Sequence, residues 1–443
     1  MKFSQFNTLL PIDENHSLLY NAFSDKYIVL KPTTYEAVRG GSVEQIKNEQ
    51  PLLYEQLVDC KALVDENIEE WREVFDHIHE IIEDDSDYEL QVNPTVDCNF
   101  RCWYCYENHV KGSRMDACMV ERVKRHIDKV LSTHHHLQRL HISFFGGEPL
   151  MYFSTVAGPL IAYAKKACAD KGVRFMLHFT TNGYLLNRKM IEAFEGIPAS
   201  FQITLDGARE QHNRTRFMPN GKGSFDRIVQ NIKSLTDFGH VVILRINYTA
   251  VNMHDISSIC SSLADVSEQQ KQLIRVNFQR VWQDSDSKFY DDEVRACISK
   301  QMAAFKDAGF RVSYHKIMSA RPCYGDMRNH VLINYNGDAF CCTARDFDTH
   351  ARAGYLADDG TIVWENEEKE RRMSLKFSRE ECHRCRIAPI CGGGCTQRAV
   401  ERMSIPGCSL DFTDEDINQM LLERFEYVFM SSENDVKSTL CKD

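Results

Sequence analysis

The sequence of 443 residues lacks a long apolar run and an apolar N-terminal segment. None of its apolar stretches approaches the roughly 18 residues that a membrane-spanning helix needs. The first residues, Met1 to Phe6, do not form the apolar core of a secretory signal, and Asp13 and Glu14 follow soon after. We therefore expect a cytoplasmic protein without a membrane partner.

Basic residues are also in short supply. The chain has 53 Lys and Arg against 64 Asp and Glu, which gives a net charge of −11. Because general nucleic-acid binding depends on neutralising phosphates with Lys and Arg, we expect no nucleic-acid partner. Repeats and low-complexity tracts are absent, and the apolar share of 43% excludes a largely disordered chain. At roughly 150 residues per domain, the length predicts about three domains.

Cysteine, in contrast, is abundant, with 17 residues. In a long chain without a secretory signal, clustered cysteines favour metal or redox chemistry over disulfides. Ten of the 17 fall in three tight groups, and the other seven are scattered. For most of the scattered cysteines we expect the role of a small buried apolar side chain.

Hydrophobic patterning predicts four segments. Residues 1–85 form a small α+β module, and residues 88–308 form a regular core. Residues 310–413 have little regular core and many cysteines, a combination usually held together by metal, and residues 414–443 form a helix and a polar tail. The N-terminal module is expected to contain a hairpin formed by Leu18–Ala22 and Tyr27–Leu30, a short helix over 33–38, a helix over Val43–Leu63 interrupted at Pro51, and an amphipathic helix over Trp71–Ile82.

Within residues 88–308, short β-rich runs alternate with helical stretches, which predicts an α/β fold. Six β–α units in series predict a parallel sheet with right-handed crossovers. Six units are too few for a closed eight-stranded barrel, so we expect an open or partial (β/α)6 barrel with ligands at the carboxyl ends of the strands. The expected strands are Tyr88–Val92, His141–Phe145, Phe175–Phe179, Phe201–Leu205, Val241–Ile246 and Ile274–Gln279, and the expected helices are Met115–Leu131, Ser154–Cys168, Arg188–Phe194, Phe225–Phe238, Ile256–Leu263 and Val294–Phe305.

The first cysteine group, Cys98, Cys102 and Cys105, has the spacing C-x3-C-x2-C directly after the first predicted strand. Thiolates suit zinc and iron–sulfur clusters. A structural zinc site takes four ligands, and His109 is the only neighbour of the right type. Three thiolates can hold three irons of a four-iron cluster and leave the fourth iron open. Zinc and coincidental spacing are the alternatives.

This motif, after the first strand of a partial barrel, resembles the radical S-adenosylmethionine (SAM) superfamily. The resemblance implies that the open iron chelates SAM, and that an electron from the cluster cleaves SAM to methionine and a 5′-deoxyadenosyl radical. That radical removes a hydrogen atom from an unactivated carbon, so Cys98, Cys102 and Cys105 are the expected catalytic residues. Two further motifs carry the resemblance. Gly146-Gly147-Glu148-Pro149 is similar to the family's GGEP motif. The run from Thr204-Leu205-Asp206-Gly207 through Arg216 to Phe225 is similar to a pattern of the family members that act on peptides.

The resemblance implies how these residues surround SAM. The two glycines allow close backbone approach, and a carboxylate or carbonyl of the motif can accept from the SAM ammonium. Arg216 suits the SAM carboxylate, with Thr204 as a second donor, and Tyr104 is expected near the adenine. The full expected set is Tyr104, Gly146, Gly147, Glu148, Pro149, Asn182, Thr204, Asp206, Arg216, Arg245 and Asn247.

The later cysteines resemble the seven-cysteine SPASM domain, which carries two auxiliary four-iron clusters, so the expected total is three 4Fe-4S clusters. The combined resemblance covers about residues 88–410. A zinc ribbon is the alternative. Two alternatives remain for the fourth ligand of the inner cluster. Ile317 to Pro322 contains no cysteine, so either Cys341 is that ligand or one iron of the inner cluster has no protein ligand. The resemblance assigns Cys382, Cys385, Cys391 and Cys408 to an outer cluster and Cys323, Cys342 and Cys395 to an inner cluster.

SPASM enzymes mostly modify peptides or proteins, and two branches are similar to this chain. Anaerobic sulfatase maturases, which form formylglycine, carry a catalytic Asp directly after the cysteine matched by Cys342. This chain has Thr343 there, with Asp346 nearby. We therefore rank formylglycine formation second. Maturases of ribosomally made peptides, which form thioether or carbon–carbon cross-links or epimerise residues, come first.

The expected protein is thus a radical SAM oxidoreductase that forms an oxidative cross-link in a precursor peptide. Its N-terminal module is either winged-helix-like, binding the leader segment of the peptide as an added strand, or a structural cap. The family implies a flavodoxin- or ferredoxin-type electron donor. A non-catalytic, metal-stabilised binding protein is the alternative of another class, and the motifs at the strand ends argue against it.

Overall fold

The computed structural model describes residues 1–284, 292–314, 322–347 and 351–430. The polar tail from residue 431, with Cys441, and most of the stretch from Ile317 to Pro322 lie outside the described residues. Within the described ranges, no helix combines the length and the apolar character needed to cross a membrane. Two compact units make up the chain: a sheet unit of Asp84–His315 and Arg328–Lys369, and a terminal unit of Met1–Glu83, Lys316–Met327 and Glu370–Asp443.

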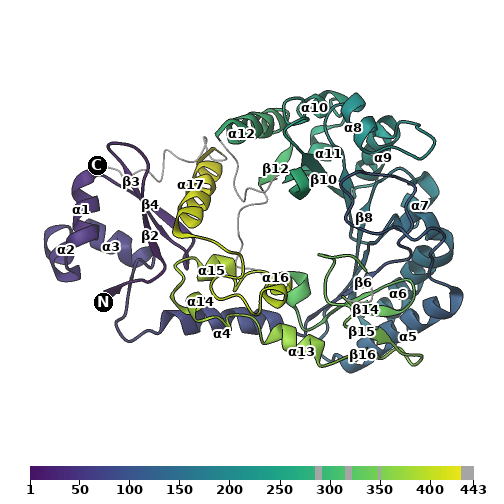
Figure 1. Cartoon of the computed structure of the whole chain (residues 1–443), viewed down its shortest axis with the longest axis horizontal. Helices are drawn as coiled ribbons and strands as arrows, with labels where there is room; N and C mark the ends of the chain where they lie inside the picture. The colour runs from purple at the N-terminus through teal and green to yellow at the C-terminus, as the bar shows by residue number, and fades with distance from the viewer. Residues whose placement is uncertain (285–291, 315–321, 348–350, 431–443) are drawn as a thin grey trace. The chain divides into compact units, whose positions relative to one another are not determined.

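A parallel sheet forms the centre of the sheet unit (Figure 1). All six predicted strands are present, which confirms the expected α/β fold with a partial barrel. A seventh parallel strand was not predicted, because four residues are too few to show a period. In spatial order the strands are β12 (Arg311–Tyr314), β11 (Ile274–Arg280), β10 (Val241–Tyr248), β9 (Ala199–Thr204), β8 (Arg174–Thr181), β7 (Arg139–Phe144) and β6 (Asp87–Val92).

The cysteine-rich segment after residue 327 extends the same sheet. β13 (His330–Ile333) runs parallel to β6, and three antiparallel strands follow. These strands have only three or four residues, so the sequence showed no regular pattern there. They are β14 (Asp338–Phe340), β15 (Gly354–Leu356) and β16 (Ile362–Trp364).

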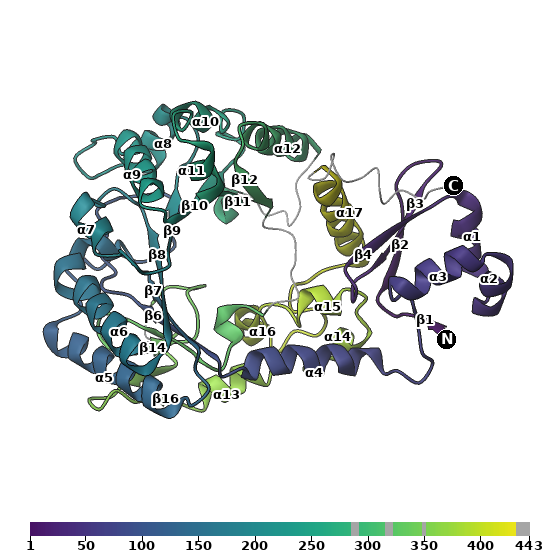
Figure 2. The same cartoon turned by 180° about the vertical axis from the view of Figure 1, so that it is seen from behind.

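Helices follow the parallel strands and cover one face of the sheet (Figures 1 and 2). Side chains alternate between the faces of a strand, and the apolar positions of one face, such as Leu90, Ile142 and Leu177, are fully buried. Polar residues occupy the alternate positions, so the opposite face is polar. The helices are α5 (Ala117–Thr133), α6 (Gly158–Lys171), α7 (Arg188–Glu192), α8 (Arg209–Thr215), α9 (Phe225–Asp237), α10 (Ser258–Ser262), α11 (Glu268–Leu273) and α12 (Asp292–Asp307).

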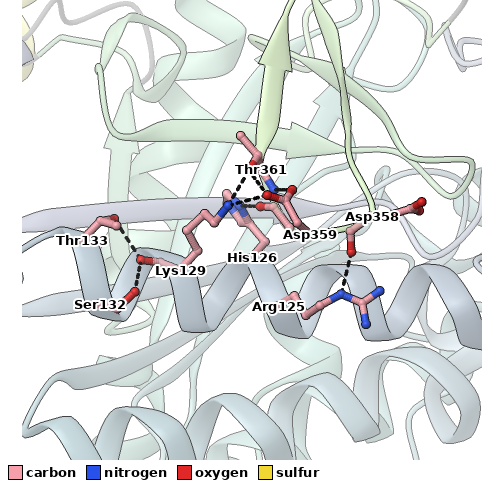
Figure 3. A network of polar contacts seen from close by, with 9 residues as sticks. Arg125, His126, Lys129, Ser132, Thr133, Asp358, Asp359 and Thr361 are labelled. Carbon is pink, nitrogen blue, oxygen red and sulfur yellow. Dashed lines mark hydrogen bonds and ion pairs between the residues drawn. The ribbon is translucent and has the colours of Figure 1, made fainter.

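The turn between β15 and β16 is anchored on α5 by polar contacts (Figure 3). Arg125 Nε donates to the carbonyl of Asp358 at 2.6 Å, and His126 Nδ1 lies 2.8 Å from the carbonyl of Gly360. Lys129 Nζ lies 2.9 Å from the Asp359 carboxylate. A Cβ on Gly360 would lie 2.6 Å from the α5 backbone, so this close approach requires glycine.

The N-terminal part of the terminal unit is a three-stranded antiparallel sheet between helices. The predicted hairpin is confirmed as β3 (Ser17–Asn21) and β4 (Lys26–Leu30), and β2 (Asn7–Pro11) adds an unpredicted strand on the far side of β3. Leu19 packs toward the first three helices, whereas the Tyr27 ring on the other face lies 5.5 Å from the Phe425 ring of α17 (Asp414–Met430), tilted against it. Those helices are α1 (Pro32–Gly40), α2 (Val43–Glu49) and α3 (Pro51–Asp59), and β1 (Lys2–Phe3) pairs with β5 (Leu63–Val64).

The predicted amphipathic helix is confirmed as α4 (Glu70–Glu83), with Val74, Ile78 and Ile82 buried. Within the terminal unit it contacts α14 (Glu380–Arg384) and α15 (Ala388–Cys391). The Trp71 ring stacks on His383 with ring centroids 4.1 Å apart. Helix α4 therefore packs against the two short helices that contain Cys382 and Cys391. Short helices also occur at α13 (Glu368–Met373), α16 (Thr396–Glu401), η1 (Pro149–Tyr152), η2 (Phe153–Ala157), η3 (Trp282–Asp284) and η4 (Tyr324–Asp326).

Candidate functional site

The first cysteine group lies on the loop between β6 and α5, at the carboxyl end of the sheet. Asp97 Oδ1 accepts from the backbone N–H of Cys98 at 2.8 Å, and the Phe100 N–H lies 3.4 Å from Cys98 Sγ. Burial raises the pKa of the thiols of Cys98 and Cys102, and raises that of Cys105 to about 11. Such thiols stay protonated at neutral pH until a metal centre displaces the proton.

The donor set fits an iron–sulfur cluster. Three soft sulfur ligands lie within one short, partly buried loop, and thiolates are the ligands that hold such clusters. Among the described residues, no three His, Cys, Asp or Glu side chains are grouped closely enough to hold one metal ion. A cluster has a different requirement, because each thiolate binds a different iron.

The loop after β7 packs directly on the turn that leads into the cysteine loop. Gly146 and Gly147 have φ of 79° and 48°, the left-handed region that favours glycine. A Cβ on Gly147 would lie 2.1 Å from the carbonyl oxygen of Asp97, so no other residue fits. The glycine pair therefore brings the following residues against the cysteine loop.

Glu148, the carboxylate of this motif, is fully buried and uses its oxygens within the protein. It accepts from Thr181 Oγ1 at 2.7 Å, from the N–H of Asn182 at 2.8 Å and from the N–H of Leu150 at 3.0 Å. Pro149 begins η1 directly after it. The side chain thus ties the end of β8 to the end of β7.

Tyr104, between two of the loop cysteines, joins a polar network with residues of β10 and of the segment between β9 and α9. Its hydroxyl donates to Asp206 and accepts from Arg216 at 2.6 Å and from Asn247 Nδ2 at 3.1 Å. Arg245 Nε donates to Asn247 Oδ1 at 2.8 Å. Burial raises the pKa of Asp206, and the Arg216 guanidinium opposes that rise. The structure therefore brings together five of the residues that the sequence had singled out.

Other predicted residues lie at the same edge of the sheet. Thr204 ends β9 beside Arg245, and both it and Asn182 are buried. Asn182 Nδ2 donates to Asn99 Oδ1 at 2.8 Å within the cysteine loop. Arg216 is buried, and its Nε has no hydrogen-bond partner within the part of the chain that the structure describes. A buried cation with a spare donor suits an anionic group such as a carboxylate.

The sequence reasoning did not select Glu107, two residues after Cys105. Its Oε2 accepts from the Gly147 N–H at 2.8 Å, so it links the cysteine loop to the glycine pair. Burial raises its pKa to about 7. Its nearness in sequence to Cys105 was the one available signal, since its partner lies 40 residues away.

In the terminal unit, four cysteines line one cavity of about 600 Å³: Cys382, Cys385, Cys391 and Cys408. Burial and the neighbouring thiols raise the pKa of Cys382 to about 11 and that of Cys391 to about 12. These four are the predicted outer-cluster ligands, and four converging sulfur donors fit a cluster. Of the other predicted ligands, Cys323 and Cys395 belong to the terminal unit, and Cys341 and Cys342 follow β14 in the sheet unit.

Comparison with known families decides what the strand-end motifs are. Residues 92–263 match the family model described as the Radical SAM superfamily. The chain carries a radical SAM domain. This domain contains the cysteine loop, the glycine pair and the polar network around Tyr104, and the superfamily is one whose members use a 4Fe-4S cluster and SAM.

Proteins similar to the radical SAM domain include sulfatase-maturating enzymes and a cyclopropyl synthase. A cysteine-type anaerobic sulfatase-maturating enzyme of Clostridium novyi is 29% identical over 149 residues, 32% of this chain and 38% of that protein. The radical SAM cyclopropyl synthase TigE of Paramaledivibacter caminithermalis is 22% identical over 162 residues, 33% of this chain and 32% of that protein. The matched region thus spans about a third of the length of these curated relatives.

Two solved structures show the same fold over a longer stretch. Streptococcus suis SuiB bound to S-adenosylmethionine aligns over 91% of this chain and 97% of its own, with a TM-score of 0.51 and 15% identity. Native anSMEcpe with bound AdoMet aligns over 77% of this chain and 97% of its own, with a TM-score of 0.53 and 16% identity. At these identities the likeness describes the fold.

Proposed function

We propose that this protein is a radical SAM peptide maturase that forms an oxidative cross-link, thioether or carbon–carbon, in a ribosomally made precursor peptide. The observation that carries the proposal is the second set of four cysteines around one cavity, in addition to the cysteine loop of the radical SAM domain. A cross-link removes two electrons from the substrate, and auxiliary clusters offer them a route out.

The residues divide the work as follows. Cys98, Cys102 and Cys105 would hold the catalytic cluster, which with SAM supplies a 5′-deoxyadenosyl radical that abstracts hydrogen from a substrate carbon. Buried Arg216 would bind the SAM carboxylate with its spare Nε donor, and Tyr104 and Asp206 keep its guanidinium oriented. Cys382, Cys385, Cys391 and Cys408 would hold an outer auxiliary cluster, and the predicted inner set stays as the resemblance implies.

Formylglycine formation is the second candidate, because sulfatase-maturating enzymes are among the curated relatives. The residues after Cys342 argue against formylglycine formation. Thr343 stands where that branch carries its Asp, and its carbonyl accepts from the Tyr106 hydroxyl at 2.7 Å. Asp346 accepts from the N–H of Asn108 at 3.0 Å and from that of Phe347 at 2.9 Å. Its carboxylate is thus engaged in anchoring the loop.

The N-terminal module supports a peptide substrate with a leader segment. Its three-stranded sheet ends in β4, which pairs only with β3 among the described strands, and three short helices follow. An edge strand is the element to which an extended peptide adds by backbone hydrogen bonds. Leader binding at β4 is therefore the role proposed for this module.

The decisive experiment measures the mass of a candidate substrate peptide by mass spectrometry. The protein is reconstituted anaerobically and incubated with SAM, a strong reductant and a short peptide encoded beside its gene. We expect 5′-deoxyadenosine and a peptide lighter by two hydrogens, with fragmentation locating a cross-link between two residues. The control replaces Cys98, Cys102 and Cys105 by Ala and forms neither product. Formylglycine as the main product, or 5′-deoxyadenosine with an unchanged peptide mass, would contradict the proposal.

A further inference from the structure

One oxygen of Glu107 lacks a partner although it is buried beside the cysteine loop. Oε2 accepts from the Gly147 N–H at 2.8 Å, whereas Oε1 has no hydrogen-bond partner among the described residues. Leaving a buried carboxylate oxygen unsatisfied is unfavourable, so such an atom in a native protein calls for an explanation. The natural partner is a hydrogen-bond donor that arrives with a ligand.

The three other carboxylates around the loop have hydrogen-bond partners among the described residues. Glu148 accepts three hydrogen bonds from within the chain. Asp97 accepts from the N–H of Cys98 through one oxygen and from the N–H of Gly112 through the other, both at 2.8 Å. Asp206 accepts from Tyr104 and from the Asn247 N–H. Of these four carboxylates, Glu107 alone keeps a buried oxygen without a hydrogen-bond partner in the described part of the chain.

We propose that Glu107 Oε1 accepts a hydrogen bond from the ammonium group of SAM. The inference rests on the radical SAM domain. The methionine part of SAM carries one anionic and one cationic group. Arg216, whose buried Nε has no partner among the described residues, donates to Tyr104 within the cysteine loop, and Glu107, two residues after Cys105, accepts from Gly147. Arg216 is thus available for the carboxylate of SAM, and Glu107 is available for its ammonium group. A hydrogen bond between two charged groups is among the strong ones.

The competing explanation is that Glu107 only secures the Gly147 loop. Glu107→Gln separates the two roles, because the amide oxygen can still accept from the Gly147 N–H while an NH2 group replaces the free acceptor. The matched control is Glu192→Gln, which removes the same charge from an exposed position of α7 in the same unit. The ligands are SAM and its analogue with hydrogen in place of the amino group.

The measurement is the Kd of each ligand by calorimetry on the oxidised, iron-loaded protein, with no peptide and no reductant. We expect E107Q to weaken SAM binding about 10- to 100-fold, the value of a hydrogen bond to a charged group. Binding of the deaminated analogue should be nearly the same in E107Q and in the unmutated protein, and E192Q should change neither.

Equal losses for both ligands, or no loss for SAM, would overturn the inference and leave Glu107 a loop anchor. If E107Q fails to load iron, the unmutated protein and E107D still decide: the unmutated protein must prefer SAM over the analogue, and E107D must reduce that preference. Because no peptide is present, this outcome is independent of whether the proposed cross-link forms.

Discussion

Two carboxylates of the radical SAM domain, Glu148 and Glu107, differ in their hydrogen-bond partners and in how visible they are in the sequence. The GGEP motif drew attention to Glu148, and the structure gives its carboxylate to Thr181 and Asn182 at the next strand end. Glu107 carried no motif, yet it contacts Gly147. Spacing along the chain identifies which loops meet at the sheet edge. It does not identify which oxygen is left over, because that depends on partners more than 30 residues away.

His126 on α5 shows a residue whose charge state the fold controls (Figure 3). Its Nδ1 faces the carbonyl of Gly360, so Nδ1 carries the proton and Nε2 accepts from the Tyr88 hydroxyl at 2.9 Å. Burial lowers its pKa from 6.5 to about 4. No sequence pattern indicates this role, because the two partners lie on a strand and on a hairpin turn distant in the chain.

This lowered pKa makes stability depend on pH. Below pH 6.5 the unfolded chain takes up a proton that the folded chain refuses until about pH 4, so the stabilising contribution is complete above pH 6.5 and is lost between these values. The full loss is about 3 kcal/mol, at roughly 1.4 kcal/mol per pKa unit. We expect the free energy of unfolding in urea to fall less from pH 7.5 to 5.5 in His126→Asn than in the unmutated protein. Equal decreases would show that His126 does not titrate this way.

Among the elements, length separates what the sequence predicts from what it does not. The six strands of six to eight residues and the long amphipathic helices α4, α5 and α9 have room for a clear period. The strands of three or four residues after residue 310 do not. β12 joins the sheet at β11, whereas β13 and the three strands after it join at the edge of β6. Their pairing partner is therefore set by tertiary packing.

Two turns of the terminal unit are joined by a buried lysine. Lys376 Nζ lies 2.7 Å from the Asp326 carboxylate and donates to the Gly394 carbonyl at 2.5 Å. Asp326 belongs to the turn that starts at Cys323, and Gly394 precedes Cys395. The ion pair thus connects two of the predicted inner-cluster ligands before any metal is considered.

Removing this lysine should therefore affect both stability and iron loading. Lys376→Met leaves the Asp326 carboxylate buried without its cation, and we expect a loss of about 3–5 kcal/mol in the free energy of unfolding, together with a lower iron content. Lys26→Met, which breaks the exposed pair with Asp59, is the control and should cost at most about 1 kcal/mol. K376M with D326N should recover part of the loss. A K376M protein as stable as the control would refute a structural role for the pair.

At the scale of the whole molecule, the two ends of the chain fold into one compact unit, the terminal unit. Residues 1–83 and 370–430 fold together, so the proposed leader-binding sheet and the four-cysteine cavity share one compact body. Gln5 Nε2 donates to the carbonyl of His383 at 3.0 Å, next to Cys382. The sequence predicted the parts separately. The packing of the N-terminal residues against the last cysteine group was not predictable, because no local sequence pattern indicates a contact across 378 residues.

Leader binding gives a prediction at this scale. If the precursor peptide adds a strand at β4, the backbone amides of Lys26–Leu30 gain hydrogen-bond partners and should exchange with deuterium more slowly in the full-length protein when the peptide is present. The amides of α2 serve as the internal reference and should not change. A peptide that binds without protecting β4 would assign the module a structural role and move the leader site elsewhere.

The composition of the terminal unit also has a consequence for biosynthesis. Its first 83 residues leave the ribosome long before residues 370–430 are made, because the chain of the sheet unit comes between them. At roughly 5–20 residues per second, the wait lasts on the order of tens of seconds. During that time the face of β3 and β4 that carries Tyr20 and Tyr27 has no α17 to cover it. The nascent N-terminal segment therefore exposes this face until α17 has been made, and the four-cysteine cavity is complete only when both ends of the terminal unit are present.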